Sequence, residues 1–254
     1  MTRHADVVRR EFARQAPDFA APRTLFGDPA IADWIGSHLP LEPQDCVLDV
    51  CGGAGHLSRL LSARARQFVV LDLTREMLDT GRRGAEEEGV RNVLFVEGDA
   101  GAMPFVDASF EVAVSRFAFH HVADPEAVTR EMARVVRPGG YVAIVDMVKG
   151  GARHDELERL RDVSHTRALS EEELTVLLER AGAPVVDRDA RHGTLAALPW
   201  LERGLPEPEA AERVLEALRA EAAGGEPTGL EAHEDESGTL HVAQRWALLV
   251  GAKR

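Results

Sequence analysis

The sequence VLDVCGGAGHLSRLL, residues 47–61, decides the fold more than any other part of this chain. Its apolar beginning, interrupted by Asp49, is typical of a buried parallel strand. Gly52, Gly53 and Gly55 then allow a sharp turn in which the backbone approaches a ligand, where a Cβ atom would clash. Apolar residues at helical spacing complete the stretch. A strand, a glycine-rich turn and a helix in this order predict a nucleotide-type site at the carboxyl end of a sheet.

The glycine spacing alone does not identify the class of ligand. The dinucleotide fingerprint requires G-x-G-x-x-G, whereas the chain reads G-A-G-H-L-S from Gly53 and lacks the third glycine. Asp49 stands before the turn instead. Asp72 ends the next apolar run, about where a ribose-binding carboxylate is expected, roughly 20 residues on. The alternative for this stretch is a tight turn that serves packing only.

Composition bounds the class of protein. The 254 residues are 44% hydrophobic and 29% charged, which suits one large α/β domain with or without a cap. A formal net charge of −13 without a basic patch argues against a nucleic-acid partner. Cys46 and Cys51 form neither a disulfide framework nor a zinc spacing. Because the start lacks a signal-peptide core and no apolar run has membrane-spanning length, we expect a cytoplasmic protein without a membrane span.

Apolar runs and helical patterns alternate along the chain, which predicts a doubly wound, mostly parallel sheet. The predicted strands are Cys46–Val50, Gln67–Asp72, Asn92–Val96, Phe110–Ser115, Tyr141–Met147, Val185–Arg191 and His241–Val250. The predicted helices are His56–Ala65, Thr74–Glu88, Pro125–Val135, Ser170–Ala181 and Pro208–Ala222. Ser170 and Glu173 form a capping box at one helix start. Pro138-Gly139-Gly140 is expected to end a helix and turn the chain into the fifth strand.

Two segments lie outside this alternation. Residues 1–39 indicate helices broken at Pro17 and Pro22, and residues 193–238 separate the last two strands. Both could cover the carboxyl edge of the sheet, although a disordered acidic loop suits residues 224–238 equally well. We therefore expect an N-terminal helical lid (1–40), a Rossmann-like core (41–192), an inserted helical cap (193–238) and a final core strand (239–254).

Several motifs follow one another in a family-specific order. They are Asp49 with the CGGAG turn, Asp72, EGDAGAMPF (97–105), FEVAVSRFAFHHVADP (110–125) and ARVVRPGGYVAIVD (133–146). The set resembles the class I S-adenosylmethionine (SAM)-dependent methyltransferases, most closely the quinone-biosynthesis UbiE-like group and its small-molecule relatives. The match covers residues 47–146. LRDVSH (160–165) further resembles a segment in an uncharacterised bacterial branch of that family.

The resemblance implies a Rossmann-like fold with a seven-stranded, mostly parallel sheet whose last strand is antiparallel. In this family caps are often inserted at the edge hairpin, where residues 193–238 lie, and N-terminal segments fold over SAM and exclude water. Phe12 and Phe19 belong to such a segment here, and packing on the outer helices is their alternative role. Cys51 departs from the family's usual glycine at the start of the turn, where a small residue fits.

The resemblance also implies contacts to the amino acid and ribose portions of SAM. Asp49 and the backbone of Gly53 and Gly55 would hold the amino acid end, although Asp49 could instead cap the next turn. Asp72 would accept hydrogen bonds from both ribose hydroxyls.

For the adenine, Asp99 would accept from the exocyclic amine, and Ala100 would donate its N–H to the ring. The ring faces would be covered by Leu73, Met77 and Met103, of which the two methionines are as often plain core.

The fourth strand ends with Ser115 and Arg116, which in relatives lie beside the methionine portion. Arg116 could also pair with a substrate carboxylate, or with Asp146 or another acid to hold the loop. Neither reading is excluded by the residues alone.

Methyl transfer is an in-line displacement, so orientation supplies much of the catalysis, and a base is needed only when the acceptor keeps a proton. His120 and His121 follow the fourth strand, and His121 is favoured because residues there line the acceptor pocket in relatives. In a second polar cluster, Asp162 and His165 could form a carboxylate–imidazole pair that raises the basicity of His165, and Arg161 shares a helical face with His165. The alternative for both sets is a structural role.

We therefore expect an enzyme that uses SAM, releases S-adenosylhomocysteine (SAH) and methylates oxygen or carbon of a small molecule, in bacterial specialised or quinone-like metabolism. A SAM- or SAH-binding protein of this fold with a cyclase-like or regulatory role is the alternative, and an acidic interaction protein with a vestigial pocket is the third. No metal site is expected, because His120, His121 and Asp124 lack ligand spacing. A monomer and a homodimer remain equally open.

Overall fold

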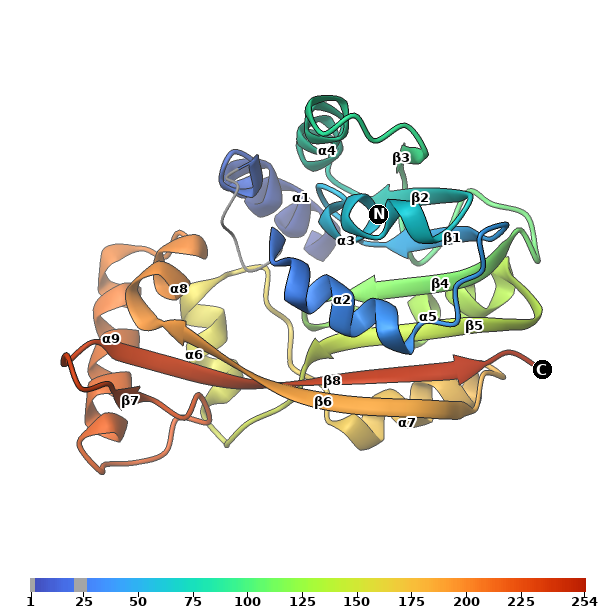
Figure 1. Ribbon diagram of the computed structural model, residues 1–254. Helices are drawn as coiled ribbons and strands as arrows, with labels where there is room; N and C mark the ends of the chain where they lie inside the picture. Colours follow the sequence, from blue (N-terminus) through green and yellow to red (C-terminus); the bar gives the residue numbers. More distant parts are fainter. Residues whose placement is uncertain (1–2, 21–26) are drawn as a thin grey trace.

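The structure is a computed structural model that describes residues 3–20 and 27–254 (Figure 1). Its centre is one sheet with the strand order β3-β2-β1-β4-β5-β8-β6. The strands are β1 (Cys46–Val50), β2 (Gln67–Asp72), β3 (Val93–Glu97), β4 (Phe110–Arg116), β5 (Val136–Met147), β6 (Val185–Ala196) and β8 (Leu240–Ala252), with the short β7 (His233–Glu234) beside β8. Strands β1 to β5 pair in parallel, and β8 is antiparallel to both β5 and β6. The predicted sheet is confirmed, with β7 as a small addition.

Helices cover both faces of the sheet. They are α1 (Arg3–Gln15), α2 (Pro29–His38), α3 (His56–Leu60), α4 (Arg75–Glu87), α5 (Pro125–Val135), α6 (His154–Arg161), α7 (Glu171–Arg180), α8 (Ala197–Arg203) and α9 (Pro208–Ala222). On one face, apolar side chains of α2, α3 and α4 pack against those of β1 and β2. On the other, α5 and α7 pack against β1, β4 and β5. The two layers fix the carboxyl ends of the parallel strands at one edge, where a ligand site is expected.

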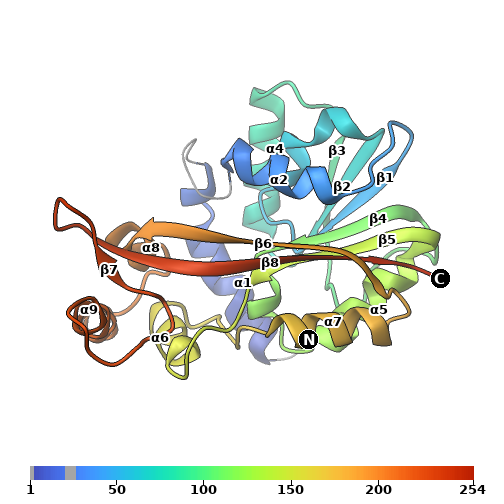
Figure 2. The same cartoon turned by 60° about the horizontal axis from the view of Figure 1, so that its bottom comes forward.

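A third apolar cluster forms beyond the main sheet. Leu157 of α6, Trp200 of α8 and Leu218 of α9 are buried together with Val242 of β8. Figure 2 shows these helices gathered at one end of the long strands β6 and β8, away from the C-terminus. We call α6, α8, α9, β7 and this end of β6 and β8 the cap. It has its own apolar core, because each amphipathic helix must bury its apolar face against another element.

Most predicted elements agree with the structure. The bounds of β1, β2 and α5 are as predicted, and the capping box is confirmed, since the Ser170 side chain accepts from the Glu173 N–H and the reverse bond is also made. Helix α1 ends at Gln15, ahead of the predicted break at Pro17, whereas the predicted break at Pro22 lies outside the described residues.

The turn expected at residues 138–140 is wrong. Helix α5 ends at Val135, and Val136 already pairs with Phe110 of β4. The register shifts before the next pair, and Gly139 takes up the irregularity with a φ of +76°. Residues 138–140 therefore form a bulge within β5, a feature that inserts extra residues without ending a strand.

Strand β6 is longer than predicted. It continues past Arg191 to Ala196 and pairs with β8 throughout. A glycine at 193 permits this pairing, because a Cβ atom there would lie 1.9 Å from the Trp246 ring. Helix α8 follows at once and was not predicted, whereas α9 has the predicted bounds.

Candidate active site

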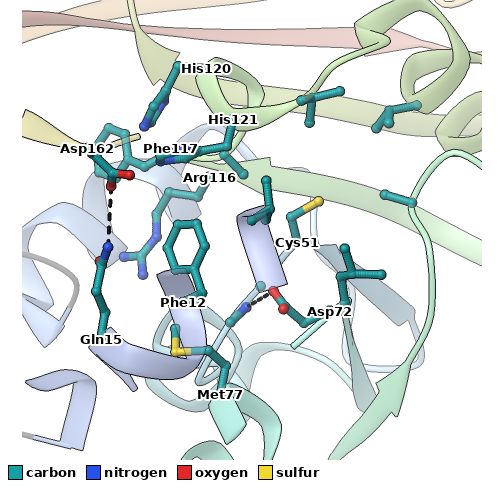
Figure 3. A pocket seen from close by; sticks show the side chains of 18 of the residues that line it. Phe12, Gln15, Cys51, Asp72, Met77, Arg116, Phe117, His120, His121 and Asp162 are labelled. Carbon is teal, nitrogen blue, oxygen red and sulfur yellow. Dashed lines mark hydrogen bonds between the residues drawn. The ribbon is translucent and has the colours of Figure 1, made fainter. Parts of the chain in front are cut away.

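A cavity of about 360 Å³ opens at the carboxyl ends of the parallel strands (Figure 3). The loops after β1, β2, β3 and β4 supply one part of its wall, and α1 supplies another. The cap supplies the rest, through Arg161, Asp162, Leu195, Trp200 and Arg203, joined by Gln244 and Trp246 of β8. The wall is thus built from three parts of the chain that lie far apart in sequence.

Asp49 of β1 lines the cavity and is buried, with 1% of its surface exposed. Its carboxylate accepts a hydrogen bond of 2.7 Å from the Ser58 hydroxyl at the start of α3. Burial raises the pKa of Asp49 to about 6, although Ser58 and the nearby Arg116 both lower it. The group is therefore mostly ionised at neutral pH and suits a cationic partner in the cavity.

The glycine turn brings β1 and β2 together at their ends. Cys51 and Gly53 have φ values of +55° and +56°, which place the Gly53 N–H 2.8 Å from one Asp72 oxygen. The other Asp72 oxygen accepts from the Thr74 N–H at 2.8 Å. Asp72 is therefore held rigidly in the cavity wall, and burial raises its pKa. Burial and the surrounding carboxylates also raise the pKa of the Cys51 thiol, which stays protonated.

Gly55 has a different role from the one expected. It lies outside the cavity wall and precedes α3 with a φ of +66°. A Cβ atom there would lie 2.9 Å from the Phe95 ring. Gly55 therefore serves the close packing of α3 on the sheet, while Gly52 and Gly53 face the cavity.

Of the five residues predicted to contact an adenine, four line the cavity: Leu73, Met77, Asp99 and Ala100. The fifth, Met103, does not. It is 5% exposed in the core between β4 and α5, and its N–H donates to Glu131. The plain-core alternative thus applies to Met103, because the chain after Gly101 turns back toward α5.

Ser115 and Arg116, at the end of β4, were both predicted to lie in the site, but their side chains differ in position. Arg116 lines the cavity and lies between Phe12 and the histidines in Figure 3, whereas the Ser115 side chain is fully buried outside the wall. Burial lowers the pKa of Arg116 to about 10, and the Asp49 carboxylate offsets part of that effect. The pairing of Arg116 with Asp146 is wrong, because Asp146 bonds to His120 instead.

His120 and Asp146 form a buried dyad. His120 Nδ1 lies 2.6 Å from Asp146 Oδ1, and the His120 backbone N–H donates to the other Asp146 oxygen at 3.1 Å. The two residues are 4% and 2% exposed. Burial alone would lower the pKa of His120, but the Asp146 carboxylate outweighs it and raises the pKa above its ordinary value. The carboxylate fixes which ring nitrogen carries the proton and leaves Nε2 as the acceptor.

His121 is held differently although it is adjacent in sequence. Its Nδ1 lies 3.0 Å from the Ser164 hydroxyl, which donates to Asp162 Oδ1 at 2.5 Å. Burial and the neighbouring His120 lower the pKa of His121 to about 3. The His121 ring is therefore neutral at pH 7, and the Phe12 ring of α1 meets it edge-on at 5.0 Å.

The predicted Asp162–His165 pair is wrong. Helix α6 ends at Arg161, and the Asp162 side chain accepts from the Ser164 N–H at 2.8 Å, which turns the chain out of the helix. His165 Nε2 bonds to Asp155 at 2.9 Å, outside the cavity wall. Burial and His120 lower the pKa of His165, so its basicity falls instead of rising.

Helix α1 lies across the cavity and contacts both of its ends. Its Phe12 lines the wall together with Phe19 of the following turn, and the two rings are 6.5 Å apart. His4 Nε2 lies 2.8 Å from the His121 carbonyl, and the Arg9 side chain donates to the Leu73 carbonyl at 3.4 Å. Gln15 donates to Asp162 at 3.3 Å (Figure 3).

Sequence reasoning missed four polar residues that organise the site: Ser58, Asp146 as the partner of His120, Ser164 and Gln15. Asp146 carried a signal, since it is next to last in β5, which is adjacent to the strand before His120, and Ser164 carried one in the Asp-x-Ser pattern at 162–164. Within residues 3–20 and 27–254, no three His, Cys, Asp or Glu side chains are grouped as a metal site requires. No helix of the described chain has the length and apolar character to cross a membrane.

Comparison with known proteins agrees with this site. A family model described as a methyltransferase domain matches residues 47–140. The chain is 33% identical over 165 residues to the uncharacterized methyltransferase YcgJ of Bacillus subtilis (strain 168), with 62% of this chain and 64% of that protein covered. It is 36% identical over 137 residues to the ubiquinone/menaquinone biosynthesis C-methyltransferase UbiE of Ruegeria sp. (strain TM1040), with 53% and 52% covered. The chain thus spans between half and two thirds of the length of these relatives.

The similarity extends to the structure. The crystal structure of YcgJ from Bacillus subtilis matches with a TM-score of 0.81 at 25% identity, over 89% of this chain and 99% of that one. The strand order and the carboxylates at the ends of β1 and β2 define a protein of the class I methyltransferase fold. Residues 47–140 match a methyltransferase domain, and the chain is similar to SAM-dependent methyltransferases of the UbiE-like group in sequence and in fold.

Proposed function

We propose that this protein transfers the methyl group of SAM to an oxygen or carbon atom of a small molecule. The observation that carries the proposal is one continuous cavity wall with Asp49, Asp72 and Asp99 at one end and His120 at the other, where Asp146 holds His120 from behind the wall. A carbon acceptor is favoured by the relative named as a quinone-biosynthesis C-methyltransferase. Bacterial specialised or quinone-like metabolism is the setting we propose.

The residues present fit SAM. The ionised, buried Asp49 suits the cationic amino acid end, and Asp72, fixed by two backbone N–H groups, retains lone pairs for the ribose hydroxyls. Asp99 and the Ala100 N–H would bind the adenine edge, with Leu73 and Met77 against its faces. When bound, SAM supplies an electrophilic methyl group on a sulfonium centre.

The proposed base is His120. Its pKa is raised by Asp146, which brings it toward the pH at which a base is most effective, whereas the pKa of His121 is far below neutral. His120 Nε2 would accept the proton of an acceptor hydroxyl or acidic C–H, and Asp146 would stabilise the resulting imidazolium. His121 would contribute a neutral polar wall, oriented by Ser164.

Helix α1 acts in this proposal as a lid. It bridges both ends of the cavity through His4 and Arg9, and its Phe12 covers the middle. A lid of this kind excludes water, so that hydrolysis does not compete and the electrostatic contacts inside are stronger.

The proposal is tested by calorimetry with SAM and SAH on wild type and Asp72→Asn. Loss of the charged acceptor should weaken binding about 10–100-fold. Asp33→Asn is the matched control, because Asp33 is exposed on α2, outside the cavity wall. Equal binding by Asp72→Asn and wild type would refute the ribose contact. SAH binding without methyl transfer to any acceptor in a screen would favour the non-methylating alternative.

A further inference from the structure

The cap gives the cavity two arginines. Arg161 is the last residue of α6 and Arg203 the last residue of α8, and both line the wall. The two helix ends meet closely, because a Cβ atom on Gly204 would lie 2.2 Å from the Arg161 carbonyl oxygen. Glycine at 204 therefore permits the contact that brings the two guanidinium groups into one region of the cavity.

Arg161 is fixed on one edge only. Its Nε donates to Glu158 at 2.8 Å, its Nη1 lies 3.4 Å from the Trp200 carbonyl, and its guanidinium stacks over the Trp200 ring at 4.9 Å. For Nη2, the part of the chain that the structure describes offers no hydrogen-bond acceptor. Arg161 is 7% exposed, so this edge of the guanidinium faces the cavity and not bulk water.

Two carboxylates near the arginines, Glu158 and Asp162, already have partners. Glu158 is fully buried, and its two oxygens accept from Arg161 and from the Gln244 side chain at 2.7 Å. Asp162 accepts from Ser164 and Gln15. Asp18, which also acts on Arg203, is exposed in the short 3-10 helix Asp18–Ala20 that follows α1.

The surroundings of Arg203 disfavour its positive charge, because it is partly buried and because Arg161 nearby is also a cation. Burial and then Arg161 lower the pKa of Arg203, and Asp18 and Glu158 offset only part of that effect. Two guanidinium groups that repel each other in a cavity wall are stabilised by a bound anion. The structural alternative is that both arginines only tie α6 to α8.

Aromatic and apolar side chains surround the pair. Trp200 and Trp246 are 2% and 4% exposed and line the same cavity, together with Leu195 and Phe117. The Phe117 and Trp246 rings meet edge-on at 5.1 Å. Such walls suit the apolar or aromatic body of a ligand, with a few polar groups to orient it.

The geometry points to a subsite in which Arg161 and Arg203 bind an oxyanion, a carboxylate or a phosphate, on the methyl acceptor, whose apolar or aromatic body lies along Trp200 and Trp246. This inference rests on the proposed function and names the class of its acceptor. Binding the anion at this subsite would orient the acceptor, so that one atom faces the methyl group beside His120.

The test is calorimetry on the full chain saturated with SAH. The probes are 1-hydroxy-2-naphthoate against its uncharged amide, and 1-naphthyl phosphate against 1-naphthol. We expect at least one anion to bind about tenfold or more tightly than its uncharged analogue. Which anion is preferred identifies a carboxylate or a phosphate acceptor.

In Arg203→Gln the preference for the anion should fall to near one, and Arg203→Lys should restore part of it, because lysine keeps the charge but not the planar fork. Arg180→Gln is the matched control, since Arg180 is exposed at the end of α7 and should leave the preference unchanged. An unchanged preference in Arg203→Gln overturns the inference, as does wild type that binds SAH but shows no preference or binds no probe. Failure to bind SAH would instead contradict the proposed function.

Discussion

The two ends of the cavity are stabilised by different kinds of contact. At the end proposed to bind the cofactor, carboxylates near the ends of β1 and β2 accept hydrogen bonds from the turns that follow these two strands, as Asp72 does from Gly53 and Thr74. At the acceptor end, charged side chains meet partners from distant elements, as His120 meets Asp146 and Glu158 meets Gln244. The first arrangement depends on one edge of the sheet, whereas the second joins separate segments: His120–Asp146 links the turn after β4 to β5, and Glu158–Gln244 links α6 of the cap to β8. Substitutions should therefore separate cofactor binding from acceptor chemistry and cap stability.

The largest effect is expected for Asp146→Asn. Loss of the carboxylate removes the orientation and raised pKa of His120, so kcat on an acceptor found by screening should fall about 10²–10⁴-fold. SAM affinity should stay within a few-fold, because Asp146 lies outside the cavity wall. NMR titration of His120 should show a lower pKa in the variant.

Asp33→Asn serves again as the control for this change, and it should leave both constants unchanged. An Asp146→Asn protein with full kcat would show that His120 is not the base, even if its pKa had fallen. Equal loss of SAM affinity and kcat would mean that the two ends of the cavity are not separable.

The next largest effect concerns the cap. Glu158→Gln leaves Arg161 buried without its charged partner, which should lower the free energy of unfolding by about 3–5 kcal/mol. Burial opposes ionisation of Glu158, but Arg161 outweighs it and holds the pKa of Glu158 well below its ordinary value. The ionised Glu158 side chain therefore stabilises the wild-type protein at any pH above the ordinary pKa of a glutamate. This stabilisation is lost as the pH falls toward the lowered pKa of Glu158. The free energies of unfolding of wild type and Glu158→Gln, measured with denaturant, should approach each other at acidic pH.

Glu156→Gln is the matched control on the same helix. The Glu156 side chain is 48% exposed, and its ion pairs with Arg153 and Arg213 are long, at 3.6 and 3.7 Å. Exposed pairs contribute about 0–1 kcal/mol, so this variant should remain close to wild type at every pH. Similar losses in both variants would mean that burial of the Glu158–Arg161 pair adds nothing.

A third, smaller effect should follow from Gly193→Ala. The added Cβ atom would lie 1.9 Å from the Trp246 ring, and overpacking of this kind costs about 1–3 kcal/mol. Thermal unfolding measures the change. Gly101→Ala is the comparison, because a Cβ atom there meets only the flexible Asp99 carboxylate at 3.3 Å. If the two variants are equally stable, β6 adjusts to the ring without cost.

The same difference between the two ends explains what the sequence could predict. Asp49, the glycine turn and Asp72 lie within 24 residues, and their positions follow from one strand–turn–helix unit and its neighbour. Asp146 lies 26 residues after His120, and its partner depended on how the turn after β4 directs its side chains toward β5. Asp146, one of the partners that the sequence offered for Arg116, bonds to His120 instead.

His165 shows a second limit. Three-residue spacing suggested a pair on one helix, but an aspartate side chain can bond the N–H two residues on and end the helix, as Asp162 does with Ser164. The D-x-S pattern at 162–164 contained that signal. The cap could not be assembled from sequence either, because α8 follows β6 directly and its contact with α6 depends on Gly204.

The smallest effect is expected at the cofactor end, for Ser58→Ala. The Ser58 hydroxyl donates to the ionised form of Asp49, so its removal should raise the pKa of Asp49 above about 6. Less of the carboxylate is then ionised at pH 6 to 7, and SAM should bind about three- to tenfold more weakly there. At pH 9 Asp49 is ionised in both proteins, so the difference should nearly vanish.

Calorimetry with SAM across this pH range measures the effect, and Ser109→Ala is the matched control, since its hydroxyl is exposed and bonds only to the Val106 carbonyl. A loss that is the same at every pH would mean that Ser58 positions Asp49 without changing its pKa. A pH-dependent loss with unchanged preference for anionic acceptors would show that the two ends of the cavity titrate independently. That independence is expected because Asp49 and Arg161 are stabilised by separate sets of partners.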